Sequence, residues 1–108
     1  MTTLRIEHPI TDYDTWKGAF DRFGDIRHDA GVLAHRIHRP VDDEHYVIID
    51  LDFDSAAQAE RFLGILKQRV WAVPESSPAL AGAPQTRLLE TLERADRGMR
   101  ARSAALST

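Results

Sequence analysis

The stretch from His45 to Phe53 constrains the fold more than any other part of the sequence. It is rich in β-branched and aromatic residues and is predicted to be the strongest strand of the chain. Because side chains alternate along a strand, one face is apolar while the other carries Asp50 and Asp52. The apolar face requires a core, and the acidic face requires water, a polar cavity or a second chain.

Composition excludes several classes of protein. A chain of 108 residues forms one domain with a real core. A net charge of -3 gives no electrostatic basis for binding nucleic acid, and the absence of cysteine excludes disulfides, thiolate metal sites and cysteine nucleophiles. No apolar run approaches the roughly 20 residues of a membrane helix, and no signal segment is visible at the N-terminus. We therefore expect a cytoplasmic protein that binds neither nucleic acid nor a membrane.

The first half of the chain predicts a strand, a helix and a second strand. Leu4 and Ile6 alternate with polar residues in a strand that ends at Pro9, and Thr11 or Asp12 can cap the helix that follows. Aromatic residues recur at helical spacing in that helix, where they are expected to be core rather than a binding box. Its interior holds the weak helix former Gly24, and Gly31 suits its C-terminal end. The second strand is predicted over 32–39.

The second half repeats this order. Ser55 and Gln58 form a capping-box pattern that opens a second helix, residues 74–84 are predicted to be a loop, and 86–92 a fourth strand. The order βαββαβ is typical of the α+β ferredoxin-like fold, with an antiparallel sheet and both helices on one face. We expect one domain over residues 1–91 and an arginine-rich, helical tail over 92–108.

The sheet face without helices is predicted to be the functional one. A short turn at 40–43 would place His38 opposite Tyr46 and Arg36 opposite Ile48 in an antiparallel hairpin. Their face, shared with Asp50, mixes charged with apolar residues. Buried charge needs partners, so this mixture indicates a sheet-on-sheet homodimer that encloses a pocket.

Three segments resemble a known group of proteins: Arg5–Lys17, Gly31–Arg36 and Val47–Ser55. Together they resemble the dimeric α/β-barrel superfamily of small antibiotic-biosynthesis monooxygenase-like and cyclase-like proteins, over residues 3–91. This resemblance implies a homodimer of ferredoxin-like subunits. It also implies a cofactor-independent monooxygenase-like or cyclase-like enzyme that acts on an aromatic or polyketide-like compound.

The chain also departs from that superfamily. Its oxygenases commonly use an active-site asparagine, and this sequence contains none. Its haem-degrading members use a histidine late in the second helical region, and this chain has no histidine after His45. We therefore expect no haem. His35 and His38 would point to opposite faces of a strand, and no metal-binding motif is present, so no metal site is expected either.

Three residues of the uncovered face form the candidate catalytic set. His38 would be the general base, Asp50 would orient it, and Tyr46 would donate to developing negative charge. Four further residues are candidates for binding a substrate. These are Arg36 as an anion anchor, Ile48 on the same face, and His8 and Trp71 at the edges of the site.

Other interpretations of the same residues remain open. The polar set can be a hydrogen-bonded layer at a dimer interface, and Arg36 can form a plain ion pair with Asp50 or Asp52. A non-catalytic dimer that binds a small aromatic ligand, or a structural or stress-associated protein, would then replace the enzyme. A ligand that stabilises the protein but is recovered unchanged would favour the binding protein.

Overall fold

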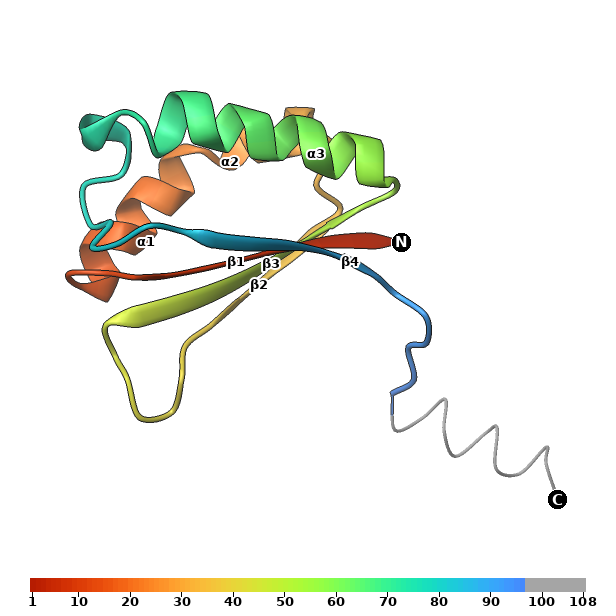
Figure 1. Ribbon diagram of the computed structural model, residues 1–108, viewed down its shortest axis with the longest axis horizontal. Coiled ribbons are helices and arrows are strands. Elements are labelled where there is room, and N and C mark those ends of the chain that lie inside the picture. Colours follow the sequence, from red (N-terminus) through yellow and green to blue (C-terminus); the bar gives the residue numbers. More distant parts are fainter. Residues whose placement is uncertain (97–108) are drawn as a thin grey trace, which may run out of the picture.

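A four-stranded antiparallel sheet forms one layer of the protein, and the helices form a second layer on one side of it (Figure 1). This is a computed structural model, and it describes residues 1–96. The strand order is β2-β3-β1-β4, which places β1 and β3 in the centre. The elements are β1 (Thr2–Pro9), α1 (Tyr13–Arg22), α2 (Gly24–Asp29), β2 (Ala34–His38), β3 (Tyr46–Phe53), α3 (Ala56–Ile65), the π-helical turn η1 (Leu66–Val70), the 3₁₀ turn η2 (Pro74–Ser76) and β4 (Gln85–Glu90).

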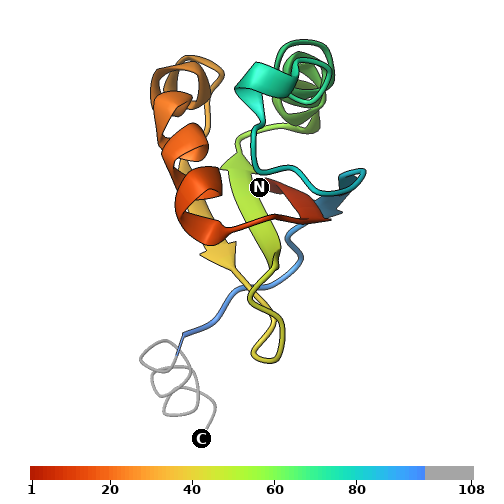
Figure 2. The ribbon, with the colours of Figure 1, turned by 90° about the vertical axis from the view of Figure 1, so that its left-hand side faces the viewer.

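The predicted ferredoxin-like fold is confirmed, with one pair of helical segments in each half of the chain. Figure 2 shows α1 and α2 beside α3 and η1, all above the same face of the sheet. The first pair is interrupted at Phe23: α1 ends at Arg22 and a new helix begins at Gly24, a residue with poor helix propensity. The prediction that both helical regions share one face of the sheet is therefore correct.

Local side-chain chemistry explains where the long helices begin. Asp12 caps α1 by accepting a hydrogen bond from the backbone N–H of Thr15 at 2.9 Å. Ser55 caps α3 in the same way, accepting from the backbone N–H of Gln58 at 3.3 Å. Both caps were among the sequence predictions.

Gly31 is required at the turn from α2 into β2. Its φ is +93°, a conformation that other residues rarely adopt, and a Cβ there would lie only 2.9 Å from the side-chain nitrogen of Gln58. The turn thus depends on glycine for its conformation and for its close approach to α3.

The predicted hairpin register is wrong by two residues. Arg36 pairs with Asp50 rather than Ile48, and His38 pairs with Ile48 rather than Tyr46. The loop is wider than predicted, and it contains Pro40, which has no N–H to donate to a strand ladder. In addition, the carbonyl of His45 is taken by the backbone N–H of Ile10 at 2.8 Å. A shift of two leaves every side chain on its predicted face.

The core lies between the sheet and the helices. Val47, Ile49, Leu51 and Phe53 of β3 are all buried, and Phe53 packs on Phe62 of α3 with ring centroids 5.9 Å apart. The apolar face predicted for the His45–Phe53 stretch is therefore the core face. No helix in residues 1–96 combines the length and apolar character needed to cross a membrane. The tail predicted to be helical lies mostly in 97–108, outside the described residues; 91–96 form no helix or strand.

Candidate functional site

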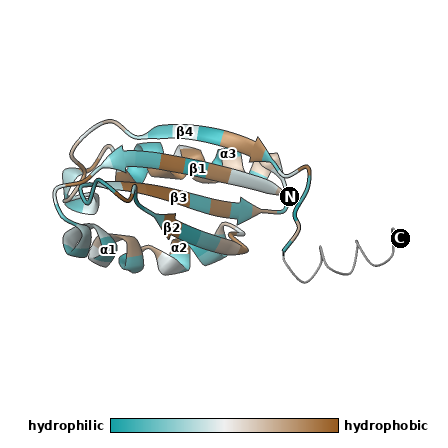
Figure 3. Cartoon of the chain, turned by 90° about the horizontal axis from the view of Figure 1, so that it is seen from below, coloured by the Kyte–Doolittle hydropathy of each residue, from teal (hydrophilic) through white to brown (hydrophobic). Residues whose placement is uncertain are grey.

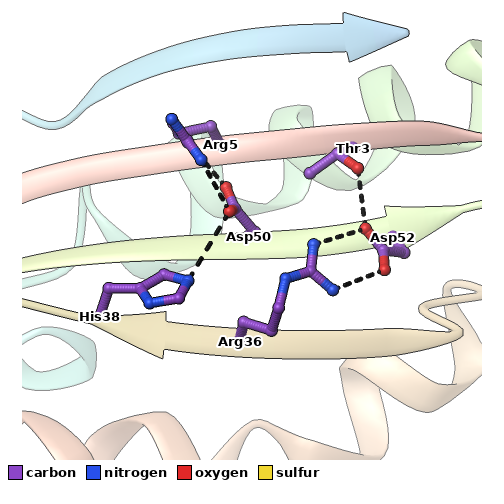
Figure 4. A network of polar contacts seen from close by, with 6 residues as sticks. All are labelled: Thr3, Arg5, Arg36, His38, Asp50 and Asp52. Carbon is purple, nitrogen blue, oxygen red and sulfur yellow. Dashed lines mark hydrogen bonds and ion pairs between the residues drawn. The ribbon is translucent and has the colours of Figure 1, made fainter. Parts of the chain in front are cut away.

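No described helix covers the open face of the sheet, which Figure 3 shows from below. This face carries two matched ion pairs (Figure 4). Arg5 on β1 donates from Nε and from one terminal nitrogen to the two carboxylate oxygens of Asp50, both at 2.9 Å. This two-point contact is the strongest common form of an arginine–carboxylate pair. Hydrogen bonding from Arg5 lowers the pKa of Asp50, so the carboxylate stays ionised despite its burial.

Asp52 is matched in the same manner by Arg36 from the other side of β3. The two terminal nitrogens of Arg36 donate to its oxygens at 2.9 and 3.0 Å, and Thr3 adds a hydrogen bond at 2.8 Å. Hydrogen bonding from Arg36 lowers the pKa of Asp52. The sequence left an ion pair of Arg36 with Asp50 or Asp52 as an alternative to an anion anchor, and Asp52 is its partner.

The remaining candidates on the open face have weaker or different contacts. His38 Nε2 lies 4.0 Å from the nearer oxygen of Asp50, beyond hydrogen-bond distance, on the side opposite Arg5. Tyr46 donates its hydroxyl to Glu7 at 2.8 Å, and this bond raises the pKa of the phenol. Ile48 on β3 is half-buried and pairs with His38 across the hairpin. The catalytic roles predicted for His38, Tyr46 and Asp50 stay predictions.

A separate cavity of about 80 Å³ lies on the other face of the sheet, between the strands and the helices. Its walls come from β1, β3, both helical pairs and the loop after η2, and they are almost entirely apolar. The lining residues are Ile6, His8, Trp16, Ala19, Phe20, Phe23, Arg27, Ile49, Leu51, Phe62, Leu66, Val70, Trp71, Ser76, Ser77, Pro78, Ala79 and Leu80. An apolar lining with a few polar groups is typical of a small-molecule site, although the cavity is smaller than the roughly 300–1,000 Å³ of sites for drug-sized ligands.

His8 is one of two ionisable residues that line this cavity. It is 4% exposed, and its Nδ1 lies 3.0 Å from the carbonyl oxygen of Pro9. A carbonyl can only accept, so Nδ1 carries the proton and Nε2 keeps its lone pair. Burial lowers the pKa of His8, which keeps the ring neutral at pH 7. Nε2 has no protein partner within residues 1–96 and is therefore available to a ligand.

Arg27 is the other ionisable residue of the cavity, and sequence analysis did not identify it. It lies on the short helix α2, is 9% exposed, and donates to the backbone carbonyl of Phe20 at 2.6 Å. Its guanidinium carbon lies 3.6 Å from the centroid of the Phe20 ring. The only available signal was its position one turn beyond the aromatic stripe of the first helix, and an exposed arginine would give the same signal.

The seven predicted site residues thus separate onto two faces. His8 and Trp71 line the cavity together, whereas Arg36, His38, Tyr46, Ile48 and Asp50 share the open face. The aromatic residues Trp16 and Phe20, predicted as core, are core and cavity wall at once, with ring centroids 5.1 Å apart. Within the described part of the chain, no three histidine or acidic residues are arranged to hold a metal ion.

Solved structures share this architecture. The cofactor-independent oxygenase SnoaB from Streptomyces nogalater superposes with a TM-score of 0.65 at 14% identity, over 86% of this chain and 94% of that one. A monooxygenase from the gene ActVA-Orf6 of Streptomyces coelicolor, solved with the ligand nanaomycin D, gives 0.58 at 15% identity, over 87% and 89%. A dimeric ferredoxin-like protein from an uncultured marine organism gives 0.60 at 11% identity, over 90% and 100%.

These comparisons establish the fold. The chain has the fold of antibiotic-biosynthesis monooxygenase-like, dimeric ferredoxin-like proteins, as its sequence resemblance predicted. No family model matches the chain, and no curated protein matches its sequence. Because one fold hosts many activities, the site itself must support any function.

Proposed function

We propose that this protein is a cofactor-independent enzyme of the monooxygenase-like or cyclase-like kind, which acts on an aromatic compound in the cavity between the sheet and the helices. The observation that carries the proposal is His8, a buried neutral histidine with one free ring nitrogen in an aromatic-walled cavity. A ring compound would pack against Trp16 on α1 and Trp71, which directly follows η1.

His8 would act as the general base. Its Nε2 would take a proton from a phenol or from an enolisable carbon, while Nδ1–H holds the ring through the Pro9 carbonyl. The resulting phenolate or enolate is the electron-rich form that reacts with molecular oxygen in an oxygenation or with an internal carbonyl in a cyclisation. One histidine and one arginine do not form a metal-ligand set, so the proposal includes no metal.

Proton exchange tests this proposal directly. In deuterated buffer, we expect the protein to accelerate loss of the acidic α-protons of 2-tetralone, an enolisable aromatic ketone, as followed by NMR. His8→Gln should remove most of that acceleration, because a positioned base contributes about 10²- to 10⁴-fold. The matched variant is His38→Gln on the open face, which should retain it.

The opposite pattern would contradict the proposal. If His38→Gln loses the proton exchange and His8→Gln retains it, the general base lies on the open face, as the sequence first indicated. Binding without exchange, with the ketone recovered unchanged in air, would indicate the alternative, a non-catalytic binding protein.

We further propose that the open face is the interface of a homodimer in the cytoplasm. The neighbour from the marine organism is described as dimeric. On this chain the open face has its two buried carboxylates already neutralised, which lowers the cost of covering it. Ile48→Asp at its centre should yield a monomer by analytical ultracentrifugation, while Val41→Asp in the fully exposed hairpin loop should not. A dimer unaffected by Ile48→Asp would refute this interface.

A further inference from the structure

Arg27 is a buried cation without an acidic partner in the described residues. The carboxylate that acts on its pKa is Asp21, which is exposed and forms an ion pair with Lys17 at 2.6 Å. No carboxylate lines the cavity, and no ion pair to Arg27 forms within residues 1–96. Burying a guanidinium is costly unless an anion compensates it, and arginine does not lose its proton in proteins. Burial lowers the pKa of Arg27, which records this cost.

The contacts of Arg27 hold its guanidinium in place and use one of its five N–H donors. One terminal nitrogen, Nη1, donates to the Phe20 carbonyl, and the guanidinium stacks on the Phe20 ring. Nε and the other terminal nitrogen, Nη2, have no protein acceptor among the described residues. Neither nitrogen is fully buried, so a solvent-sized group can reach both. The corresponding pair of nitrogens on Arg5 binds both oxygens of Asp50. The same edge of Arg27 is thus not occupied by any described residue, with Nη2 beside Gly24 of α2, while the contacts with Phe20 hold the guanidinium at the cavity wall.

The rest of the cavity defines what can carry that carboxylate. Trp16, Phe23 and Trp71 provide aromatic and apolar walls, and His8 is neutral. His35, whose ring contacts Phe20 at 5.2 Å between centroids, adds no negative charge. A ligand matching these walls is a flat ring system with a single anionic group.

We propose that Arg27 binds the carboxylate of an aromatic acid, which is the substrate class of this cavity. The inference rests on the proposed function, since it places its ligand in the same cavity as His8. It adds a specificity-determining residue on α2 and an anionic group on the substrate.

Two isosteric probes test the charge preference. At pH 8, where His8 is neutral, we expect isothermal titration calorimetry to show 2-naphthoate binding at least about tenfold more tightly than 2-naphthamide. That ratio corresponds to about 1.4 kcal/mol, close to the lower limit of about 1.5–3 kcal/mol for a hydrogen bond to a charged group. Arg27→Met keeps the apolar stem and should bring the two affinities to equality. The matched control Arg22→Met, exposed at the end of α1, should keep the preference.

The outcomes separate this inference from the proposed function. Equal binding of both probes by the wild-type protein would overturn the role of Arg27 and leave an aromatic site in place. Binding of neither probe would overturn both. Circular dichroism establishes whether Arg27→Met is folded. If it is not, a crystal structure of the wild-type protein with 2-naphthoate decides, because a carboxylate beyond hydrogen-bond distance of Arg27 refutes the inference.

Discussion

The two faces of the sheet carry charge in different ways. On the open face, each buried carboxylate is matched by an arginine on a neighbouring strand, Asp50 by Arg5 and Asp52 by Arg36. On the helix face, His8 and Arg27 line an apolar cavity whose described walls contain no carboxylate. Matched charges satisfy one another and leave little for a ligand. Unmatched polar groups in an apolar cavity are costly to stability, and such groups mark a candidate binding site.

The largest expected change is in the free energy of unfolding of variants on the helix face. It tests whether this face has a closely packed region beside an open cavity. Phe53→Ala removes a fully buried ring and should lower the free energy of unfolding by about 3–5 kcal/mol. Trp71→Ala removes a half-buried ring at the cavity wall and should cost less than about half as much, because less apolar area returns to water. Urea unfolding measures both. Equal losses would mean that Trp71 is ordinary core.

A smaller effect tests the open face. Asp52→Asn leaves Arg36 without its counter-charge and should lower the free energy of unfolding by about 1–3 kcal/mol. Binding of an aromatic probe in the cavity should not change, because Asp52 lies on the other side of the sheet. Asp54→Asn, just beyond the same strand and exposed, serves as the control. Loss of probe binding in Asp52→Asn would contradict the separation of the two faces.

The smallest effect is in the pH dependence of stability, and the two faces should respond in different ranges. Burial lowers the pKa of His8 and of His35 below the ordinary value of 6.5, so the unfolded chain binds more protons as the pH falls below 6.5. Their contribution to stability is complete above pH 6.5 and decreases below it. Hydrogen bonds from arginine lower the pKa of Asp50 and Asp52 below 3.8, so their contribution is lost only on further acidification through that value.

Variants separate these two ranges in urea unfolding at a series of pH values. His8→Gln should flatten the slope just below pH 6.5 and leave the slope below pH 4 unchanged. Asp50→Asn should do the reverse. A single slope that both variants alter alike would show that the faces are coupled.

Periodicity made the fold predictable, and its limits explain the errors. The alternation in β3 identified the core face because a side chain must point to one face or the other. The same alternation is unaffected by a shift of two residues, so it could not determine the hairpin register. The hydrogen bond from Ile10 to His45 helps to set the loop. It joins residues far apart in the sequence, so no local sequence pattern predicts it.

The site was only partly predictable for a related reason. Arg36, His38 and Asp50 were identified because polar residues on a strand are conspicuous among apolar ones. Arg27 has no such signal, because a charged residue on a helix is ordinarily solvated. Its burial follows from the arrangement of α2 over the aromatic rings of α1, which only the three-dimensional structure shows.

The two sides of the cavity come from different parts of the sequence, so they are synthesised one after the other. His8 and Arg27 come from the first third of the sequence, whereas Phe62, Trp71 and the wall from Ser76 to Leu80 come from the second half. A nascent chain that has emerged only as far as β3 would carry both ionisable groups and lack the opposite wall. We therefore expect a nascent chain to bind an aromatic probe only after the second helical pair has been synthesised and has packed against the sheet.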